Sequence, residues 1–202
     1  ARAMVGTSGG GFSLMVEGLG LAGITETPLV IALAQRPGPA TGLPTWTGQG
    51  DLRFVLHASQ DEFPRIVLAP KDVRECFDLT WRALNLAEEL QTPVFILTDA
   101  FIGEGHQTVE KLELGIVFIS RYKLTPDGIS RRPIPGVNNL TFLSNSDEHD
   151  EQGFSSDSAQ NRQKMMEKRM KKLQFDSSSF PSPKLFGHLK AKTTVVSWGS
   201  ST

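Results

Sequence analysis

The sequence predicts an α/β fold built on a parallel β-sheet. Three observations support this prediction. Short segments such as residues 29–33 and 93–97 are apolar at successive positions, as in strands that are buried on both faces. The segments between them show the three- and four-residue apolar spacing of helices. The strand-like segments begin roughly 25 to 35 residues apart, which leaves room for the crossover helix that joins two parallel strands.

The first strand is expected at residues 3–7 and the first helix at residues 12–25, with three glycines between them. One face of this helix carries Phe12, Met15, Leu19 and Ala22 or Gly23. Pro28 stops the helix before the second strand, at residues 29–33.

The same alternation continues along the chain. Residues 51–59 are compatible with a helix, and residues 65–69 are an apolar strand. The strongest helical pattern covers residues 72–91, with Asp72 at its electropositive start, and a fourth strand follows at residues 93–97. The apolar face of this helix is expected to carry Val73, Phe77, Thr80, Leu84 and Ala87.

The pattern changes after about residue 110, and four parts are expected. They are an α/β domain at residues 1–120, an extension at 121–174, a Ser- and Pro-rich linker at 175–192, and the first strand of a truncated second α/β domain at 193–202. Within them we expect a strand at 112–119, a basic helix at 161–173 with an apolar stripe of Met166, Met170 and Leu173, and a strand at 194–198. Because both ends look cut, we expect a fragment or a trimmed gene product.

Composition excludes several classes of protein. The net charge is -1, so no basic excess indicates a nucleic-acid partner. The apolar runs are far shorter than the ~20 residues of a membrane-spanning helix, and no secretory leader is evident, so we expect a cytoplasmic protein with no membrane contact. Cys76 is the single cysteine, so this chain cannot supply the thiolates of an iron–sulfur cluster by itself. We interpret Cys76 as a small buried hydrophobe.

Two segments could bind an anionic ligand at the carboxyl edge of the sheet. Residues 7–11, with Thr7, Ser8 and three glycines, lie between a strand and a helix, where backbone N–H groups can face an anion. A tight strand-to-helix turn without a ligand is the alternative. Arg36 follows the second strand on a loop stiffened by Pro and Gly, which suits bidentate binding of a carboxylate or phosphate. A surface salt bridge is the alternative for Arg36.

The acidic segment at residues 147–151 holds four carboxylates around His149. We interpret it as a solvated loop, paired with the basic helix that follows, rather than as a metal site. The basic helix is interpreted as solvated or partner-facing rather than as a nucleic-acid patch. His57 and His106 lack a neighbouring nucleophile in the sequence, so neither is favoured as a catalytic group.

Taken together and in order, these segments resemble the alpha subunits of 2-oxoacid:ferredoxin oxidoreductases, in particular the 2-oxoglutarate type. The matching segments are residues 7–15 (TSGGGFSLM), 35–39 (QRPGP), 41–45 (TGLPT), 50–52 (GDL), 65–70 (RIVLAP), 121–123 (RYK), 127–130 (DGIS), 132–136 (RPIPG), 147–151 (DEHDE), 161–162 (NR) and 167–173 (EKRMKKL). The similarity is collinear over nearly the whole chain.

The resemblance implies a thiamine-diphosphate pyrimidine-binding domain with Thr7, Ser8, Gly9 and Gly10 near the cofactor. It implies that Arg36 and Thr41 bind the substrate, a 2-oxoacid. A beta subunit would supply the diphosphate and magnesium site and an iron–sulfur cluster. The complex would decarboxylate the 2-oxoacid, pass electrons to ferredoxin and transfer the acyl group to coenzyme A. No residue of this chain is assigned as catalytic or metal-binding, and the chain alone is expected to be inactive.

The sequence also departs from the family pattern. The family's Tyr-Pro-Ile-Thr-Pro segment and its cofactor-activating Glu are absent and would precede Ala1. Ala40, Trp46 and Gly48 stand where Ser, Lys and Glu are usual, which leaves the particular 2-oxoacid open. A noncatalytic module that binds a partner subunit is the alternative function, and a generic phosphate-binding α/β domain is a weaker one.

Overall fold

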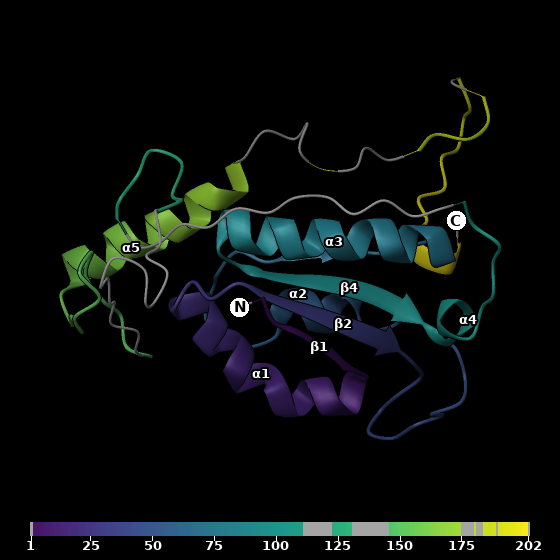
Figure 1. Cartoon of the computed structure of the whole chain (residues 1–202), viewed down its shortest axis with the longest axis horizontal. Helices are drawn as coiled ribbons and strands as arrows, with labels where there is room; N and C mark the ends of the chain where they lie inside the picture. Colours follow the sequence, from purple (N-terminus) through teal and green to yellow (C-terminus); the bar gives the residue numbers. More distant parts are fainter. Residues whose placement is uncertain are drawn as a thin grey trace.

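A computed structural model describes residues 2–110, 123–130, 146–174, 180, 184–188 and 190–201 (Figure 1). The strand expected at residues 112–119, the matching segment at 132–136, residues 121–122 of the segment 121–123 and half of the linker at 175–192 lie outside the described residues.

The four expected strands form one parallel sheet. They are β1 (Met4–Thr7), β2 (Leu29–Gln35), β3 (Ile66–Leu68) and β4 (Pro93–Asp99), and their order is β1-β2-β4-β3. Because every pairing is parallel, the carboxyl ends of all four strands lie at the same edge. The predicted α/β fold with a parallel sheet is confirmed.

Helices cover both faces of this sheet (Figure 1). They are α1 (Gly9–Ile24), α2 (Leu52–His57), α3 (Val73–Leu90), the short α4 (Ala100–Gly103) and α5 (Ala159–Lys171), with the 3-10 turns η1 (Lys172–Gln174) and η3 (Gly199–Ser201). Successive residues of a strand point to opposite faces, so β2 contributes Val30 to the core under α3 and Ile31 to the core under α1 and α2. None of the helices that the structure describes is long and apolar enough to cross a membrane.

The buried faces of the two long helices were predicted with different success. In α1, Phe12, Leu19 and Ala22 are buried, as expected. In α3, Asp72 caps the helix by accepting a hydrogen bond from the Glu75 N–H at 2.8 Å, which confirms the predicted start. The predicted apolar face of α3 holds for Leu84 and Ala87, which pack in the core, and was wrong for Val73, Phe77 and Thr80 in the first turns. The residues buried against the sheet are Ala83, Leu86, Ala87 and Leu90.

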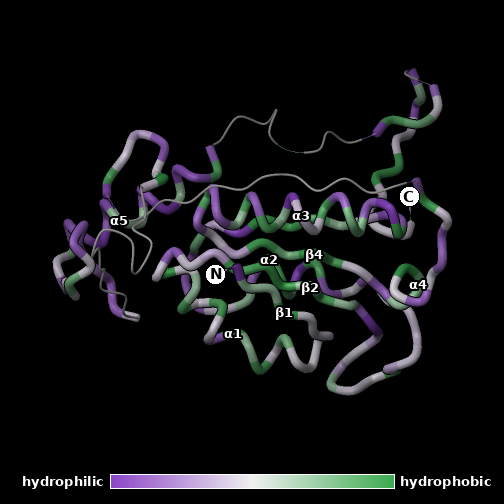
Figure 2. Tube along the Cα trace, in the orientation of Figure 1, coloured by the Kyte–Doolittle hydropathy of each residue, from purple (hydrophilic) through white to green (hydrophobic). Residues whose placement is uncertain are grey.

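Helix α3 has apolar residues on more than one side, so the same spacing fits two orientations. Figure 2 shows hydrophobic and hydrophilic residues alternating along its whole length. Its first turns, from Val73 to Thr80, are only half-buried, and this includes Cys76, which is less buried than expected. Burial raises the pKa of the Cys76 thiol, so the thiol stays protonated at neutral pH.

Two expectations for the carboxyl-terminal half were wrong. Residues 194–198 form no strand, because a strand needs a neighbour to pair with and none of the described strands lies beside them. Helix α5 forms as expected, but Met170 and Leu173 are exposed, and its buried face is Met165, Lys168 and Arg169, with Lys172 after it. The cations are buried because carboxylates from the rest of the chain meet them.

Candidate functional site

Three strands deliver polar residues to the carboxyl edge of the sheet. Thr7 ends β1, Gln35 ends β2 and Asp99 ends β4. Gln35 pairs with Asp99 across the sheet, so these two strands end level with each other. Ligand sites of open parallel sheets lie outside such carboxyl ends. In Figure 1 this edge is the end of the sheet nearest α4.

Helix α1 begins directly after β1, with glycines in its first turn. Ser8 precedes the helix in an extended conformation, and its side chain makes no capping hydrogen bond. A methyl group on Gly11 would lie 2.1 Å from Thr7 Oγ1, so close packing requires glycine there. The first N–H groups of a helix have no hydrogen-bond acceptor within the helix. The first turn of α1 has no acidic residue whose side chain could accept from them. The turn therefore offers an anion site whose walls are mostly backbone.

The loop that follows β2 is folded tightly onto Pro37. Gly42 has φ +53°, and a methyl group on it would lie 1.9 Å from the Pro37 carbonyl oxygen. The Leu43 N–H donates to that same oxygen at 3.0 Å. At the base of the loop, the Asp51 N–H donates to Gln35 Oε1 at 3.1 Å, which ties the loop's end to β2. Thr41 is exposed on this loop.

Arg36 and Asp51 both border the first turn of α1. A methyl group on Gly10 would lie 3.9 Å from Arg36 Nη2, and one on Gly9 would lie 3.4 Å from Asp51 Oδ2. Arg36 Nε and Asp51 Oδ2 are buried and have no hydrogen-bond partner within the described ranges. Burial raises the pKa of the Asp51 carboxyl, although the positive charge of Arg36 opposes that rise. The edge thus holds an unpaired donor and an unpaired acceptor beside free helix N–H groups.

The sequence-predicted residues 7–10 and Arg36 therefore come together at one edge. Asp51 is not among the predicted site residues, since the sequence indicates it only as part of the family-like segment 50–52 and does not predict its position beside Arg36. Its place directly before a helix, at the end of a loop that starts at Arg36, is the signal that could have indicated it. His57 and His106 are exposed.

A second group of polar residues lies at the same edge of the sheet, beside the end of β4. Asp99 Oδ2 accepts hydrogen bonds from Gln49 Nε2, at 3.0 Å, and from the Ser200 hydroxyl. Burial raises the pKa of Asp99, but these two donors, together with the backbone N–H groups of Phe101 and Ile102, outweigh it and hold the pKa below its ordinary value. An open pocket of about 380 Å³ lies here, lined by Thr47, Gly48, Gln49, Asp99, Phe101, Ser200 and Ser201. Sequence reasoning did not predict that η3 reaches this edge.

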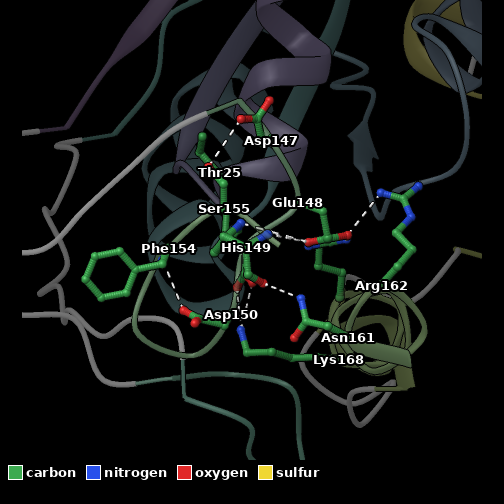
Figure 3. A network of polar contacts seen from close by, with 12 residues as sticks. Thr25, Asp147, Glu148, His149, Asp150, Phe154, Ser155, Asn161, Arg162 and Lys168 are labelled. Atoms are coloured by element: carbon green, nitrogen blue, oxygen red, sulfur yellow. Dashed lines mark hydrogen bonds and ion pairs between the residues drawn. The ribbon is translucent and has the colours of Figure 1, made fainter. Parts of the chain in front are cut away.

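The acidic segment lies at the opposite edge and pairs with α5 (Figure 3). Glu148 accepts hydrogen bonds from Arg162 Nη1 at 3.0 Å and from Arg169 Nη1 at 3.0 Å. Nearby, Glu26 accepts hydrogen bonds from Lys168 Nζ at 2.6 Å and from Lys172 Nζ at 2.7 Å. We call Glu26, Glu148, Arg162, Lys168, Arg169 and Lys172 the amino-edge ion cluster. The predicted pairing of the acidic segment with the basic helix is confirmed, but its interpretation as a solvated loop was wrong for His149, which is buried, and for Glu148 and Asp150, which are half-buried.

Within the part of the chain that the structure describes, no group of side chains has the composition and geometry of a metal site. The carboxylates of the amino-edge ion cluster instead form ion pairs with arginine and lysine side chains. Burial lowers the pKa of Lys172 to about 8 despite the attraction of Glu26.

Comparisons with known proteins agree on one family. The family model described as pyruvate flavodoxin/ferredoxin oxidoreductase, thiamine diphosphate-binding, matches residues 1–168. The chain is 44% identical over 220 residues to 2-oxoacid:ferredoxin oxidoreductase 1, subunit alpha, of Sulfurisphaera tokodaii, covering 100% of this chain and 35% of that protein. It is 45% identical over 116 residues to the 2-oxoglutarate synthase subunit KorA of Methanothermobacter marburgensis, covering 56% of this chain and 31% of that protein.

A solved structure is also similar. It is the 2-oxoglutarate:ferredoxin oxidoreductase from Magnetococcus marinus with 2-oxoglutarate, coenzyme A and succinyl-CoA bound, with a TM-score of 0.83 and 37% identity over 87% of this chain and 34% of that chain. The chain therefore spans about a third of the length of the relatives that it matches.

Proposed function

The chain belongs to the alpha-subunit family of 2-oxoacid:ferredoxin oxidoreductases, and we propose that it carries the substrate-binding part of such an enzyme. The proposed reaction is the oxidative decarboxylation of a 2-oxoacid to an acyl-CoA, with electrons passed to ferredoxin. 2-Oxoglutarate is the proposed substrate, supported by the names of a relative and of the similar solved structure.

The observation that carries the proposal is Arg36. It lies on a loop that glycines hold against Pro37, beside the first turn of α1, and its Nε is buried without a partner within the described residues. A buried donor without a partner is costly, and a bound carboxylate would satisfy it. A guanidinium can take both oxygens of a carboxylate at once. We assign the 2-oxoacid carboxylate to Arg36, with Thr41 on the same loop as a second contact.

The glycine turn is the proposed contact with thiamine diphosphate. Thr7, Ser8, Gly9 and Gly10 lie at the carboxyl end of β1 and the start of α1. The glycines have no side chains, so a ring or an anionic group can approach the backbone here. When bound, thiamine diphosphate supplies the carbanion chemistry that decarboxylation of a 2-oxoacid needs. The magnesium ion, the diphosphate site and the iron–sulfur cluster are proposed to belong to a beta subunit. A cytoplasmic location stays a prediction from the sequence.

The test is an Arg36→Ala variant in the complete alpha subunit, assembled with its beta subunit. We expect 2-oxoacid- and CoA-dependent viologen reduction to fall by about 100-fold or more, since a charged pair in a desolvated site is lost. Gel filtration should show unchanged assembly. Arg53→Ala, an exposed arginine on α2, is the matched control and should keep wild-type turnover.

Two results would contradict the proposal. A wild-type complex that reduces no acceptor with any common 2-oxoacid would exclude the enzymatic function. Full turnover in Arg36→Ala would exclude Arg36 as the carboxylate site and favour a noncatalytic interaction module.

A further inference from the structure

Asp51 is a half-buried carboxylate whose side chain has no structural partner within the described residues. It precedes α2, but its side chain does not cap that helix. Its Oδ2 is buried and accepts no hydrogen bond. The structural task of residue 51 is instead performed by its backbone, whose N–H donates to Gln35 Oε1 at 3.1 Å. Removing a carboxylate from water without a partner is costly, so a charge at this position needs another explanation.

The charged side chain that faces Asp51 is Arg36. The positive charge of Arg36 opposes the burial-induced rise in the pKa of the Asp51 carboxyl, so the two groups interact electrostatically. On the other elements packed here, Gly9 on α1 has no side chain and Gln35 on β2 is neutral. No ion pair joins Arg36 to Asp51 among the ion pairs of the described residues. Asp51 therefore attracts Arg36 without occupying its N–H groups.

The loop between these residues keeps this separation fixed. Arg36 directly follows the last residue of β2, and the Gln35–Asp51 hydrogen bond ties the far end of the loop to that same residue. Arg36 Nη2 lies near Gly10 and Asp51 Oδ2 lies near Gly9, so both charges border the first turn of α1. A guanidinium drawn toward this turn presents its free N–H groups at the carboxyl edge of the sheet.

We propose that Asp51 is a positioning residue for Arg36, whose carboxylate holds the guanidinium beside the first turn of α1 by charge and leaves its donors free for the substrate carboxylate. The inference rests on the proposed function, because it assigns the substrate carboxylate to Arg36. A direct salt bridge would hold Arg36 more firmly, but it would compete with the substrate for the same N–H groups.

The test is Asp51→Asn in the complete alpha subunit assembled with its beta subunit. Asparagine has the same shape and removes only the charge, and the Asp51 side chain makes no described hydrogen bond that it would break. We expect KM for 2-oxoglutarate, and its Kd measured by calorimetry, to rise about two- to fivefold, the effect of losing one partly solvated charge interaction. The kcat should change by less than KM. Asp78→Asn, on the exposed side of α3, is the control and should change neither constant.

A pH series separates this role from a packing role. As pH falls through the raised pKa of Asp51, the wild-type carboxyl becomes neutral and resembles asparagine. The ratio of variant to wild-type KM should therefore fall towards one at acid pH and be constant where Asp51 is ionised. Titration of the substrate affects both proteins equally and cancels in this ratio.

Equal constants for Asp51→Asn and wild type at neutral pH would overturn the inference, as would a raised ratio that does not decline in acid. A complex that binds 2-oxoglutarate without reducing viologen would contradict the proposed function instead. The ratio of the two dissociation constants would then still decide the role of Asp51.

Discussion

At the scale of single residues, glycines and two half-buried opposite charges set the geometry of the candidate site. Gly42 lets the loop after β2 fold onto Pro37, and Arg36 and Asp51 are fixed at the loop's two ends. The positions of Arg36 and of the glycine turn could be predicted, because the end of a buried parallel strand is readable from sequence. The proximity of Asp51 to Arg36 could not be predicted, since it depends on how the loop between them folds.

The first prediction compares two glycines of that loop. Gly42→Ala should lower the free energy of unfolding by about 2 kcal/mol or more, because alanine is strained at positive φ and its methyl group would overlap the Pro37 carbonyl. Gly50→Ala should have no such cost, because no atom lies within 4 Å of the added methyl group. Urea unfolding of the two variants measures the difference. Equal stability would mean that the loop adopts another conformation.

At the scale of elements, the main surprise is how α5 is buried. The hydropathy of its sequence favours Met166, Met170 and Leu173 as the buried stripe, but the helix turns Lys168, Arg169 and Lys172 inward. Hydropathy cannot predict this, because it takes no account of charge pairing. One partner, Glu148, lies in the acidic segment just before the helix, but the other, Glu26, is distant in the sequence. Once both signs of charge are buried together, Met170 and Leu173 can face outward.

Glu26 and Lys172 should therefore respond differently to replacement. Glu26→Gln leaves Lys168 and Lys172 buried without their counter-charge and should cost about 3 to 5 kcal/mol. Lys172→Met keeps the Glu26–Lys168 pair, removes a charge whose burial already lowers its pKa to about 8, and should cost far less. Thermal unfolding followed by circular dichroism measures both. A Lys172→Met variant as unstable as Glu26→Gln would contradict this account of the cluster.

At the scale of the whole molecule, the two edges of the sheet have different tasks. The carboxyl edge gathers polar residues from β1, β2 and the loop after β2, and within the described residues two of their atoms, Arg36 Nε and Asp51 Oδ2, are buried without a partner. The amino edge is closed by ion pairs to α5. The positions of the four strands follow from local patterns that are strong in the sequence, whereas their order in the sheet, β1-β2-β4-β3, depends on long-range packing and was not predicted. The strand predicted at residues 194–198 does not form, which shows the limit of such local patterns. β propensity alone forms no strand where no neighbouring strand is present to pair with it.

The amino-edge ion cluster also predicts how the molecule responds to acid. For both Glu26 and Glu148, burial would raise the pKa, but the lysines and arginines beside them outweigh it and hold the pKa below the ordinary value of 4.5. A carboxyl whose pKa is lowered by folding stabilises the fold above its unfolded pKa, and that contribution is lost as pH falls through the folded pKa. The contribution of these two groups to the free energy of unfolding should therefore be constant from neutral pH down to about pH 4.5. At lower pH this contribution should decrease.

The comparison of wild type with Glu148→Gln isolates one of these contributions. The variant should be less stable at neutral pH, because Arg162 and Arg169 lose their shared carboxylate, and its stability should depend less on pH below 4.5. The two stability curves, measured by urea unfolding, should converge in acid because protonation of Glu148 removes from wild type the same charge that the substitution removes. Curves that stay parallel down to the acid limit would show that Glu148 does not couple α5 to the rest of the fold through its charge.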